Sequence, residues 1–274
     1  MSAPVFRFAP SPTGYLHLGH AFSALYTWEA ARRAGGTVLL RIEDIDTGRC
    51  RDEFIRQIFD DLHWLGLDWP QLVRRQSKHF DDYEAAAQKL KDLGLLYECA
   101  CTRKQIAAAA GPFPARDPDG SPLYPGTCRG GVKGTQKKLW RLDMQKALKM
   151  APKGLQFVEA GAGPVDIDPA VWGDVALVRK DTPTSYHLSV VVDDAAQGVT
   201  HVTRGLDVYP ATAIHRLLQH FLDLPVPLYD HHRLILDETG RKLSKSSRDK
   251  SLKAMRASGM SASEIRAMLN FSQT

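Results

Sequence analysis

Residues 5–42 read VFRFAPSPTGYLHLGHAFSALYTWEAARRAGGTVLLRI, and this stretch predicts the class of the fold. Residues 5–9 are a short β-prone run, which two prolines and a glycine end. Residues 21–33 carry apolar side chains at helical spacing, and a glycine pair follows. Residues 37–42 are a continuous aliphatic run, typical of a strand buried on both faces. Strand, helix and strand in this order begin a βαβ unit, so we expect an α/β fold with a parallel sheet.

The rest of the chain continues this pattern with one interruption. Within residues 111–134, 11 of 24 residues are Gly or Pro, so long helices and central strands are excluded there. We therefore expect four parts: a first catalytic half (1–95), an insertion (96–172), a second catalytic half (173–233), and a basic loop with a short helical end (234–274). Expected helices are 52–67, 81–93, 211–221 and one opened by a capping box at 261–264; expected strands are 174–179, 186–193 and 199–204.

Composition limits the class of protein. The 274 residues are 43% hydrophobic and 24% charged, which excludes a disordered chain. No apolar run approaches the ~18 residues that span a bilayer, and the start lacks the pattern of a secretion signal. We therefore expect a cytoplasmic protein without a membrane partner. Thirty-six basic against 31 acidic residues give a net charge of +5, which favours an anionic partner only weakly.

Residues 10–20 (PSPTGYLHLGH) lie between the first strand and the first helix. The amide groups and the dipole of a helix N-terminus attract anions. His17 and His20, three residues apart, can both donate hydrogen bonds to one phosphate group there. Gly19 would let a nucleotide approach the backbone closely. The alternative is two ordinary surface histidines at the start of a helix.

A second candidate phosphate site is residues 240–247 (GRKLSKSS). Lys242 and Lys245 are interleaved with hydroxyl groups, which suits a polyphosphate whose charge grows as a leaving group departs. The alternative is a solvated basic tail, since the window 241–256 holds seven basic residues and one acid. Because parallel sheets bring the ends of distant strands to one edge, both segments can meet around one triphosphate.

Together these motifs resemble those of a known enzyme family. Residues 17–20 (HLGH) and 242–246 (KLSKS) are similar to the two signature motifs of class I aminoacyl-tRNA synthetases. Residues 7–14, 41–44 (RIED) and 191–194 (VVDD) resemble the glutamyl-tRNA synthetase branch. The resemblance covers roughly residues 5–250. It implies a Rossmann-type parallel sheet with an inserted zinc-containing subdomain and a short helical C-terminal segment.

The resemblance also implies roles for individual residues. It assigns catalysis to His17, His20, Lys242 and Lys245, and ATP binding to His17, Gly19, His20 and Lys245. A substrate with two carboxylates and one ammonium group suits two arginines, a carboxylate and two hydroxyls. The alternative for each such residue is a surface ion pair or a polar strand end. The implied glutamate-binding residues are Arg7, Ser11, Glu43, Tyr186 and Arg204.

Three of the four cysteines fall within 30 residues, which suggests a metal site. Cys99, Cys101 and Cys128 are one ligand short of a structural tetrahedral zinc site. Shortened paralogues of glutamyl-tRNA synthetase use Cys-x-Cys followed by Tyr-x-x-x-Cys, a pattern that Tyr124 completes here. A phenolate ligand must lose a proton whose pKa is ordinarily about 10. The alternative is a set of cytosolic thiols without a metal.

The end of the chain narrows the expected function. Only 28 residues follow Ser246, whereas an anticodon-reading domain needs on the order of 50 to 200. The resemblance therefore points to the shortened paralogues, which activate glutamate with ATP and attach it to queuosine in the anticodon of tRNA(Asp). Expected partners are L-glutamate, ATP with Mg²⁺, structural Zn²⁺ and that anticodon stem-loop, with the chain acting as a monomer.

Two other functions stay open from the sequence. These paralogues often vary the second histidine of the first motif, whereas His20 keeps the form of the longer enzymes. The glutamyl group could thus go to another RNA or to a small-molecule acceptor. A non-catalytic tRNA-binding protein is a further alternative, although a binder has no use for a pyrophosphate clamp.

Overall fold

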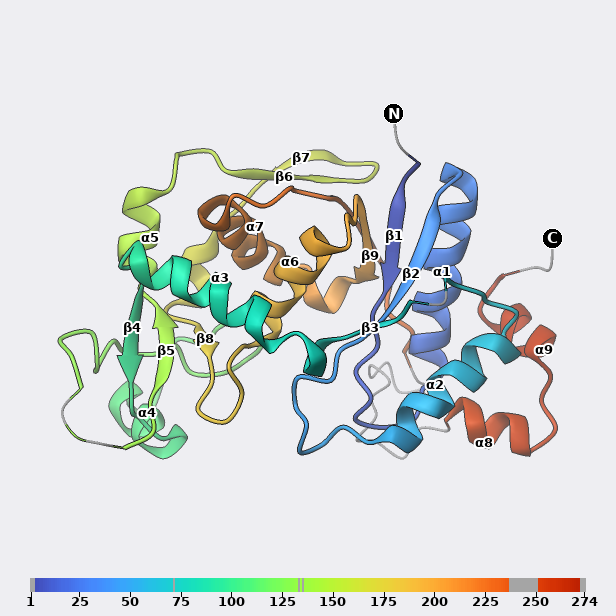
Figure 1. The fold of residues 1–274 in the computed structure, drawn as a ribbon, viewed down its shortest axis with the longest axis horizontal. Coiled ribbons are helices and arrows are strands. Elements are labelled where there is room, and N and C mark those ends of the chain that lie inside the picture. Colours follow the sequence, from blue (N-terminus) through green and yellow to red (C-terminus); the bar gives the residue numbers. More distant parts are fainter. Residues whose placement is uncertain (1–2, 71, 133, 135, 237–250, 272–274) are drawn as a thin grey trace. The chain divides into compact units, whose positions relative to one another are not determined.

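The computed structural model describes residues 3–70, 72–132, 134, 136–236 and 251–271 (Figure 1). The chain divides into two compact units, each built from separate stretches of sequence. We call Met1–Lys78, Gly198–Tyr209 and Pro227–Thr274 the first unit, and His79–Gln197 and Pro210–Val226 the second unit. Within the part of the chain that is described, no helix combines the length and apolar character needed to cross a membrane.

Parallel strands form the centre of the first unit. Here β1 (Val5–Phe8) pairs with β2 (Thr37–Ile42), which in turn pairs with the short β3 (Arg74–Arg75). Likewise β9 (His201–Gly205) pairs in parallel with β10 (Leu228–His232). The backbone of Thr200, just before β9, donates a 2.9 Å hydrogen bond to the carbonyl of Val5. The expected βαβ unit and parallel sheet are confirmed, whereas β10 was not expected from the sequence.

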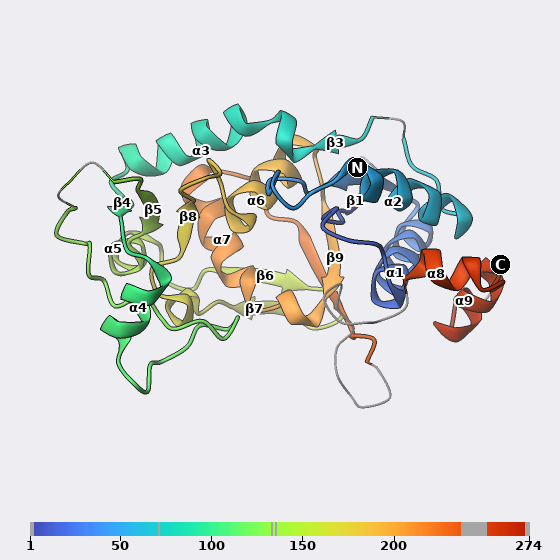
Figure 2. The same ribbon diagram turned by 90° about the horizontal axis from the view of Figure 1, so that it is seen from below.

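Helices surround these strands in the first unit. Leu25 of α1 packs in one apolar core with Leu40 of β2, and Ile58 of α2 joins them. Leu252 and Ile265 add the last two helices to the same core, and Figure 2 shows these helices beside α1 and α2. The expected capping box at Ser261 is confirmed. The helices are α1 (Leu18–Ala34), α2 (Asp52–Trp64), η1 (Gln76–Lys78), η3 (Leu206–Val208), α8 (Leu252–Ala257) and α9 (Ala262–Met268).

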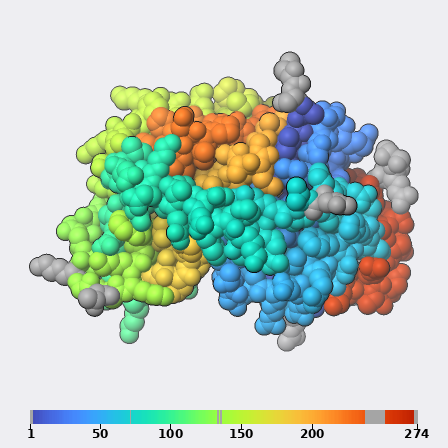
Figure 3. Space-filling view, in the orientation of Figure 1, coloured from blue at the N-terminus to red at the C-terminus, as the bar shows by residue number. Residues whose placement is uncertain are grey.

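The second unit contains antiparallel strands and a small helical layer. The order β4–β5–β8 makes an antiparallel sheet, and β6 and β7 form a hairpin. The helices α3, α6 and α7 pack on one another, and α3 lies on the surface in Figure 3. The elements are α3 (Phe80–Asp92), β4 (Leu96–Cys99), α4 (Arg103–Ala110), β5 (Leu139–Leu142), α5 (Met144–Met150), β6 (Gln156–Glu159), β7 (Gly163–Asp166), η2 (Pro169–Trp172), β8 (Ala176–Val178), α6 (Tyr186–Ala196) and α7 (Ala211–Leu222).

The strand expected at 186–193 is wrong, because these residues form the helix α6. Six of its eleven residues are buried, among them Leu188, Val190 and Val191, so α6 is buried on most sides. A helix buried in this way shows neither the helical stripe nor the strand alternation, and a run of β-branched residues then looks like a strand. Asp193, which belongs to the VVDD motif, accepts a 2.9 Å hydrogen bond from the hydroxyl of Tyr83 and so joins α6 to α3.

Candidate active site and metal site

Two histidines cap the N-terminus of α1 reciprocally. The Nδ1 of His17 accepts a hydrogen bond from the amide of Gly19 at 3.1 Å, and the Nδ1 of His20 accepts one from the amide of His17 at 3.2 Å. The ring centroids lie 3.9 Å apart. The two imidazoles therefore do for α1 what a hydroxyl and a carboxylate do in an ordinary capping box.

The capping hydrogen bonds determine which ring nitrogen of each histidine can donate a hydrogen bond. An Nδ1 that accepts a backbone N–H bond must hold a lone pair, so a neutral ring carries its proton on Nε2. Each histidine thus has an Nε2–H donor at the positive end of a helix dipole. A Cβ at Gly19 would lie only 3.0 Å from Cε1 of His17, so glycine makes room for the His17 ring. Gly19 acts on the histidine here, a role the sequence did not suggest.

Residues 251–253, which follow the second motif, contact the first motif. Ser251 forms an antiparallel β-bridge with His17, and the amide of Leu252 donates to the carbonyl of Leu16 at 2.8 Å. The ammonium of Lys253 lies 4.7 Å from the centroid of the Tyr15 ring. Lys242 and Lys245 lie outside the described residues, so their place beside the histidines stays a prediction.

Arg7 and Arg204 come together on neighbouring strands of the first unit. Both are buried, with 5% and 6% of their surface exposed. The guanidinium of Arg7 donates to the carbonyl of Thr203 at 3.1 Å, directly beside Arg204. Two buried guanidinium groups in one place suit a ligand with carboxylates.

His231 orients Arg204. The Nε of Arg204 donates to Nε2 of His231 at 3.0 Å, and the ring of Tyr229 lies 5.1 Å from the guanidinium carbon. Burial, followed by the nearby charge of Arg204, lowers the pKa of His231 to about 3. The imidazole is therefore neutral and accepts the hydrogen bond without cancelling the charge of Arg204.

Glu43 lies at the end of β2, where the sequence places it. Its carboxylate is 3.3 Å from the buried guanidinium of Arg41, and its amide donates to the carbonyl of Pro10 at 3.1 Å. This bond joins the strand end to the loop that contains the half-buried Ser11. The adjacent Asp44 has a structural task, since it accepts hydrogen bonds from Arg75 and from Ser77.

The expected glutamate-binding residues are divided between the two units. Arg7, Ser11, Glu43 and Arg204 belong to the first unit, whereas Tyr186 is the first residue of α6 in the second. The Tyr186 ring lies 5.5 Å from that of His215, which also contacts His187. Whether all five residues act together stays a prediction.

The three cysteines and Tyr124 form a compact cluster in the second unit. The sulfurs of Cys99, Cys101 and Cys128 lie within 4.8 Å of one another. The Tyr124 hydroxyl is 3.3 Å from the sulfur of Cys99 and 3.5 Å from that of Cys101. Cys101 and Cys128 are 3.5 Å apart. Antiparallel β4 and β5 hold Cys99 in place, Cys101 follows two residues later, and the Gly/Pro-rich loop brings back Tyr124 and Cys128.

These four side chains fit a tetrahedral metal. Ligand atoms around zinc with metal–sulfur bonds of about 2.3 Å lie about 3.7 Å apart, close to the separations here. Burial and the neighbouring thiols raise the pKa of Tyr124, so the phenol is protonated in the absence of a cation. The guanidinium of Arg141 lies 4.0 Å from the Tyr124 ring centroid and adds positive charge beside it. All four side chains can therefore be deprotonated together only when a cation is bound to them.

The sequence did not predict the residues that support the metal cluster, nor the one that supports the arginine pair. Arg141 donates to the backbone of Asp174 at 2.8 Å, and the Asp174 carboxylate binds Arg129, the residue after Cys128. Arg129, Arg141 and Asp174 belong to no recognisable motif. His231 was also missed because β10 was not expected, although two adjacent histidines at the end of a strand could have drawn attention.

Comparisons with known proteins agree with this geometry. The family described as tRNA synthetases class I (E and Q), catalytic domain, matches residues 5–271. The chain is 45% identical to a glutamyl-Q tRNA(Asp) synthetase of Rhodobacter capsulatus, over 96% of this chain and 98% of the relative. It is 40% identical to another from Nitratidesulfovibrio vulgaris, over 96% and 84%.

A solved structure extends the comparison. The glutamate-tRNA synthetase of Elizabethkingia anophelis superimposes with a TM-score of 0.72 at 26% identity, and the match covers 94% of this chain. The chain spans about half of that structure, 54%. It therefore belongs to the class I tRNA synthetases of the glutamate and glutamine type, in the branch of the glutamyl-Q tRNA(Asp) synthetases.

Proposed function

We propose that this chain activates glutamate with ATP and transfers the glutamyl group to queuosine in the anticodon of tRNA(Asp). The observation that carries the proposal is the 45% identity over 98% of a glutamyl-Q tRNA(Asp) synthetase. The reciprocal histidine cap supports it, since it presents two donors where a nucleotide phosphate would bind.

In the first step, a glutamate α-carboxylate oxygen attacks the α-phosphorus of ATP. The bond to the β-phosphate breaks, and pyrophosphate leaves with the electron pair. The Nε2–H groups of His17 and His20 donate to the phosphate oxygens as charge shifts onto the leaving group. Lys242 and Lys245, with the Mg²⁺ that accompanies ATP, offset the remaining negative charge.

Glutamate is bound by the two buried arginines. Arg7 and Arg204 pair with the carboxylates, and the hydroxyls of Ser11 and Tyr186 donate further hydrogen bonds. The carboxylate of Glu43 accepts from the α-ammonium group. This set favours glutamate over glutamine because an arginine binds a charged carboxylate more strongly than a neutral amide.

In the second step, a hydroxyl on the cyclopentene ring of queuosine attacks the carbonyl of glutamyl-adenylate. An ester bond forms, and AMP leaves with the electron pair of the broken mixed anhydride. The hydroxyl proton passes to the departing phosphate or to water. The reaction needs no covalent enzyme intermediate, so it depends on positioning and charge stabilisation.

A structural zinc ion in the second unit accompanies this function. Cys99, Cys101, Tyr124 and Cys128 would hold it, and it would cross-link a loop that has little apolar core of its own. The chain's own contribution is the arrangement of the four ligands and the cation of Arg141 beside Tyr124.

Two assays test the proposal. Glutamate-dependent ATP–pyrophosphate exchange should occur without RNA and should fail with glutamine. Labelled glutamate should then attach to tRNA(Asp) that contains queuosine and not to the same tRNA that lacks it. Labelling of queuosine-free tRNA(Glu) would favour another RNA as the acceptor, the alternative that the histidine form of residue 20 leaves open. Exchange without transfer to either tRNA would argue against an RNA acceptor. Absence of exchange would leave a tRNA-binding protein.

A further inference from the structure

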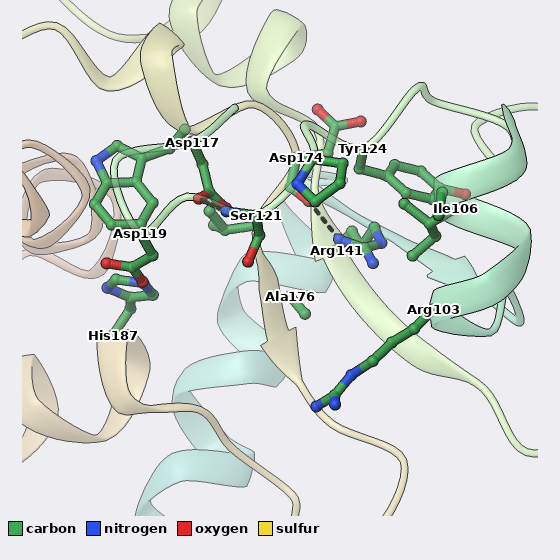
Figure 4. A pocket seen from close by; sticks show the side chains of 14 residues that line it. Arg103, Ile106, Asp117, Asp119, Ser121, Tyr124, Arg141, Asp174, Ala176 and His187 are labelled. Atoms are coloured by element: carbon green, nitrogen blue, oxygen red, sulfur yellow. Dashed lines mark hydrogen bonds between the residues drawn. The ribbon is translucent and has the colours of Figure 1, made fainter. Parts of the chain in front are cut away.

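A pocket lies in the second unit, beside the cluster of Cys99, Cys101, Tyr124 and Cys128 (Figure 4). It has a volume of about 470 Å³ and is framed by α4, by the loop before Tyr124 and by β8. Tyr124 and Trp172 contribute aromatic walls, and Ile106 contributes an aliphatic one. This volume accommodates a nucleobase with its ribose, and the pocket plays no part in the chemistry proposed above.

The deep side of the pocket is bonded within the protein in part, since the buried Nε of Arg141 has no hydrogen-bond partner among the described residues. Asp174 is buried and binds Arg129 through both carboxylate oxygens, and Arg141 donates to the Asp174 backbone while covering the Tyr124 ring. The carboxylate of Asp174 compensates the charge of Arg129, whereas Arg141 bonds only to a backbone carbonyl, so the deep side favours a ligand with a hydrogen-bond acceptor over a cation.

The rim carries charges of both signs. Arg103 extends from α4 toward the strand that bears Ala176 in Figure 4. Asp117 and Asp119 lie across from it in the lining. Two carboxylates disfavour a phosphate, and a guanidinium disfavours a simple cation. A flat neutral group with both donors and acceptors at its edge satisfies this rim, and a nucleobase has that edge.

An exposed aromatic residue indicates that the partner is an RNA loop rather than a free metabolite. Phe113 lies between two prolines on the loop that supplies Asp117 and Asp119, and its surface is 96% exposed. Proteins that bind single-stranded RNA stack unpaired bases on such side chains.

We propose that this pocket receives one unstacked nucleobase of the RNA loop that carries the queuosine, a base other than queuosine itself. The inference rests on the proposed function, because the RNA is the acceptor in that reaction. The chain would thus hold its acceptor by a neighbouring base as well as by the modified one.

The four alanines at the end of α4 allow a matched test. Both Ala107 and Ala108 are exposed, but only Ala107 lines the pocket. Ala107→Trp should fill the pocket and raise the KM for queuosine-containing tRNA(Asp) about tenfold, since one stacked base contributes on this scale. Ala108→Trp should leave the KM unchanged. Glutamate-dependent ATP–pyrophosphate exchange, measured without RNA, should be the same in both variants.

An abasic scan of a synthetic anticodon stem-loop identifies the base. For the unmodified protein, one abasic site outside the queuosine position should weaken binding about tenfold, and for Ala107→Trp the same site should have no further effect. Equal KM values for the two tryptophan variants, or additive effects of abasic site and Ala107→Trp, would overturn the inference. If the unmodified protein transfers no glutamate to RNA, the proposed function fails instead.

Discussion

The N-termini of α1 and α4 solve the same structural problem with different side chains. At α4, Thr102 and Gln105 form an ordinary capping box, and the candidate metal ligand Cys101 lies one residue outside it. At α1, His17 and His20 form the box themselves. At α4, the candidate ligand Cys101 is a different side chain from those that cap the helix. At α1, the same imidazole rings cap the helix and carry the Nε2–H donors.

This difference shows what each motif is for. Ser, Thr and Asn are the preferred N-cap residues, and imidazoles are not. The box at α9, Ser261 with Glu264, follows the preference as α4 does. Histidines at α1 therefore have a reason beyond stability, namely two Nε2–H donors at the helix N-terminus. Substitutions can separate stability from catalysis at each of these places.

The largest effect is expected when α1 receives the box of α4. The double variant His17→Thr/His20→Gln keeps a capping pair but removes both imidazole donors. Glutamate-dependent ATP–pyrophosphate exchange should fall by roughly a thousandfold or more, since one lost donor to developing charge reduces a rate by about 10²–10³. The thermal unfolding temperature should stay within a few degrees. Exchange near the original rate would refute a catalytic role for the histidines.

The next effect concerns the thiol cluster beside α4. Cys101→Ser should abolish stoichiometric zinc, measured by elemental analysis of the purified protein. Zinc that binds only the folded state stabilises it by about 4 kcal/mol at a free concentration of 1,000 times Kd, so the variant should also unfold at a lower temperature. Cys50→Ser is the matched control, since Cys50 lies outside the cluster. Equal zinc content in both variants would contradict the assigned ligands.

The two regions also differ in what could be predicted from the sequence. The histidine pair is local: four consecutive residues between a predicted strand and a predicted helix are enough to place both rings at a helix start. The cluster joins residues 99 and 128 across α4 and a loop with little regular structure, so only the cysteine spacing and the resemblance indicated it. The contacts of Arg141 and Asp174 arise from strand pairing, which residue patterns do not specify.

The parallel strands β1, β2 and β9 and the helix α1 followed from the residue pattern because each has one dominant environment, whereas β10 did not. The helix α6 did not, since burial on most sides removes the signal that separates a helix from a strand. The expectation that Gly19 lets a nucleotide approach the backbone stays a prediction, and the structure adds the space that the His17 ring requires.

A smaller effect is expected at His231, which orients Arg204. His231→Leu removes the acceptor and should raise the KM for glutamate about tenfold, with kcat in the exchange assay changing less, because a lost hydrogen bond to a charged group is worth about 1.5 kcal/mol. His231→Asn, which offers a carbonyl acceptor, should restore much of the affinity. Identical KM values for the two variants would mean that His231 acts only by packing.

The same residue makes a prediction about pH. The pKa of His231 is about 3 in the folded chain, because of burial and then Arg204, against an ordinary value of about 6.5. The unfolded chain therefore takes up the proton first, and the free energy of unfolding should decrease as the pH falls from about 6.5 toward 3. His231→Asn should show a weaker decrease between pH 7 and pH 5 in thermal melts. An unchanged slope would refute a neutral, buried His231.

The smallest effect belongs to the ordinary caps, and it completes the comparison with α1. Thr102→Ala and Ser261→Ala each remove the side chain that accepts from the backbone of the third helical residue. Each should lower the free energy of unfolding by about 1 kcal/mol, measured by urea denaturation, because one helix donor loses its partner. Exchange activity should not change in either variant. If Thr102→Ala also releases zinc, the cap of α4 helps to position Cys101, and stability and function are joined at α4 as they are at α1.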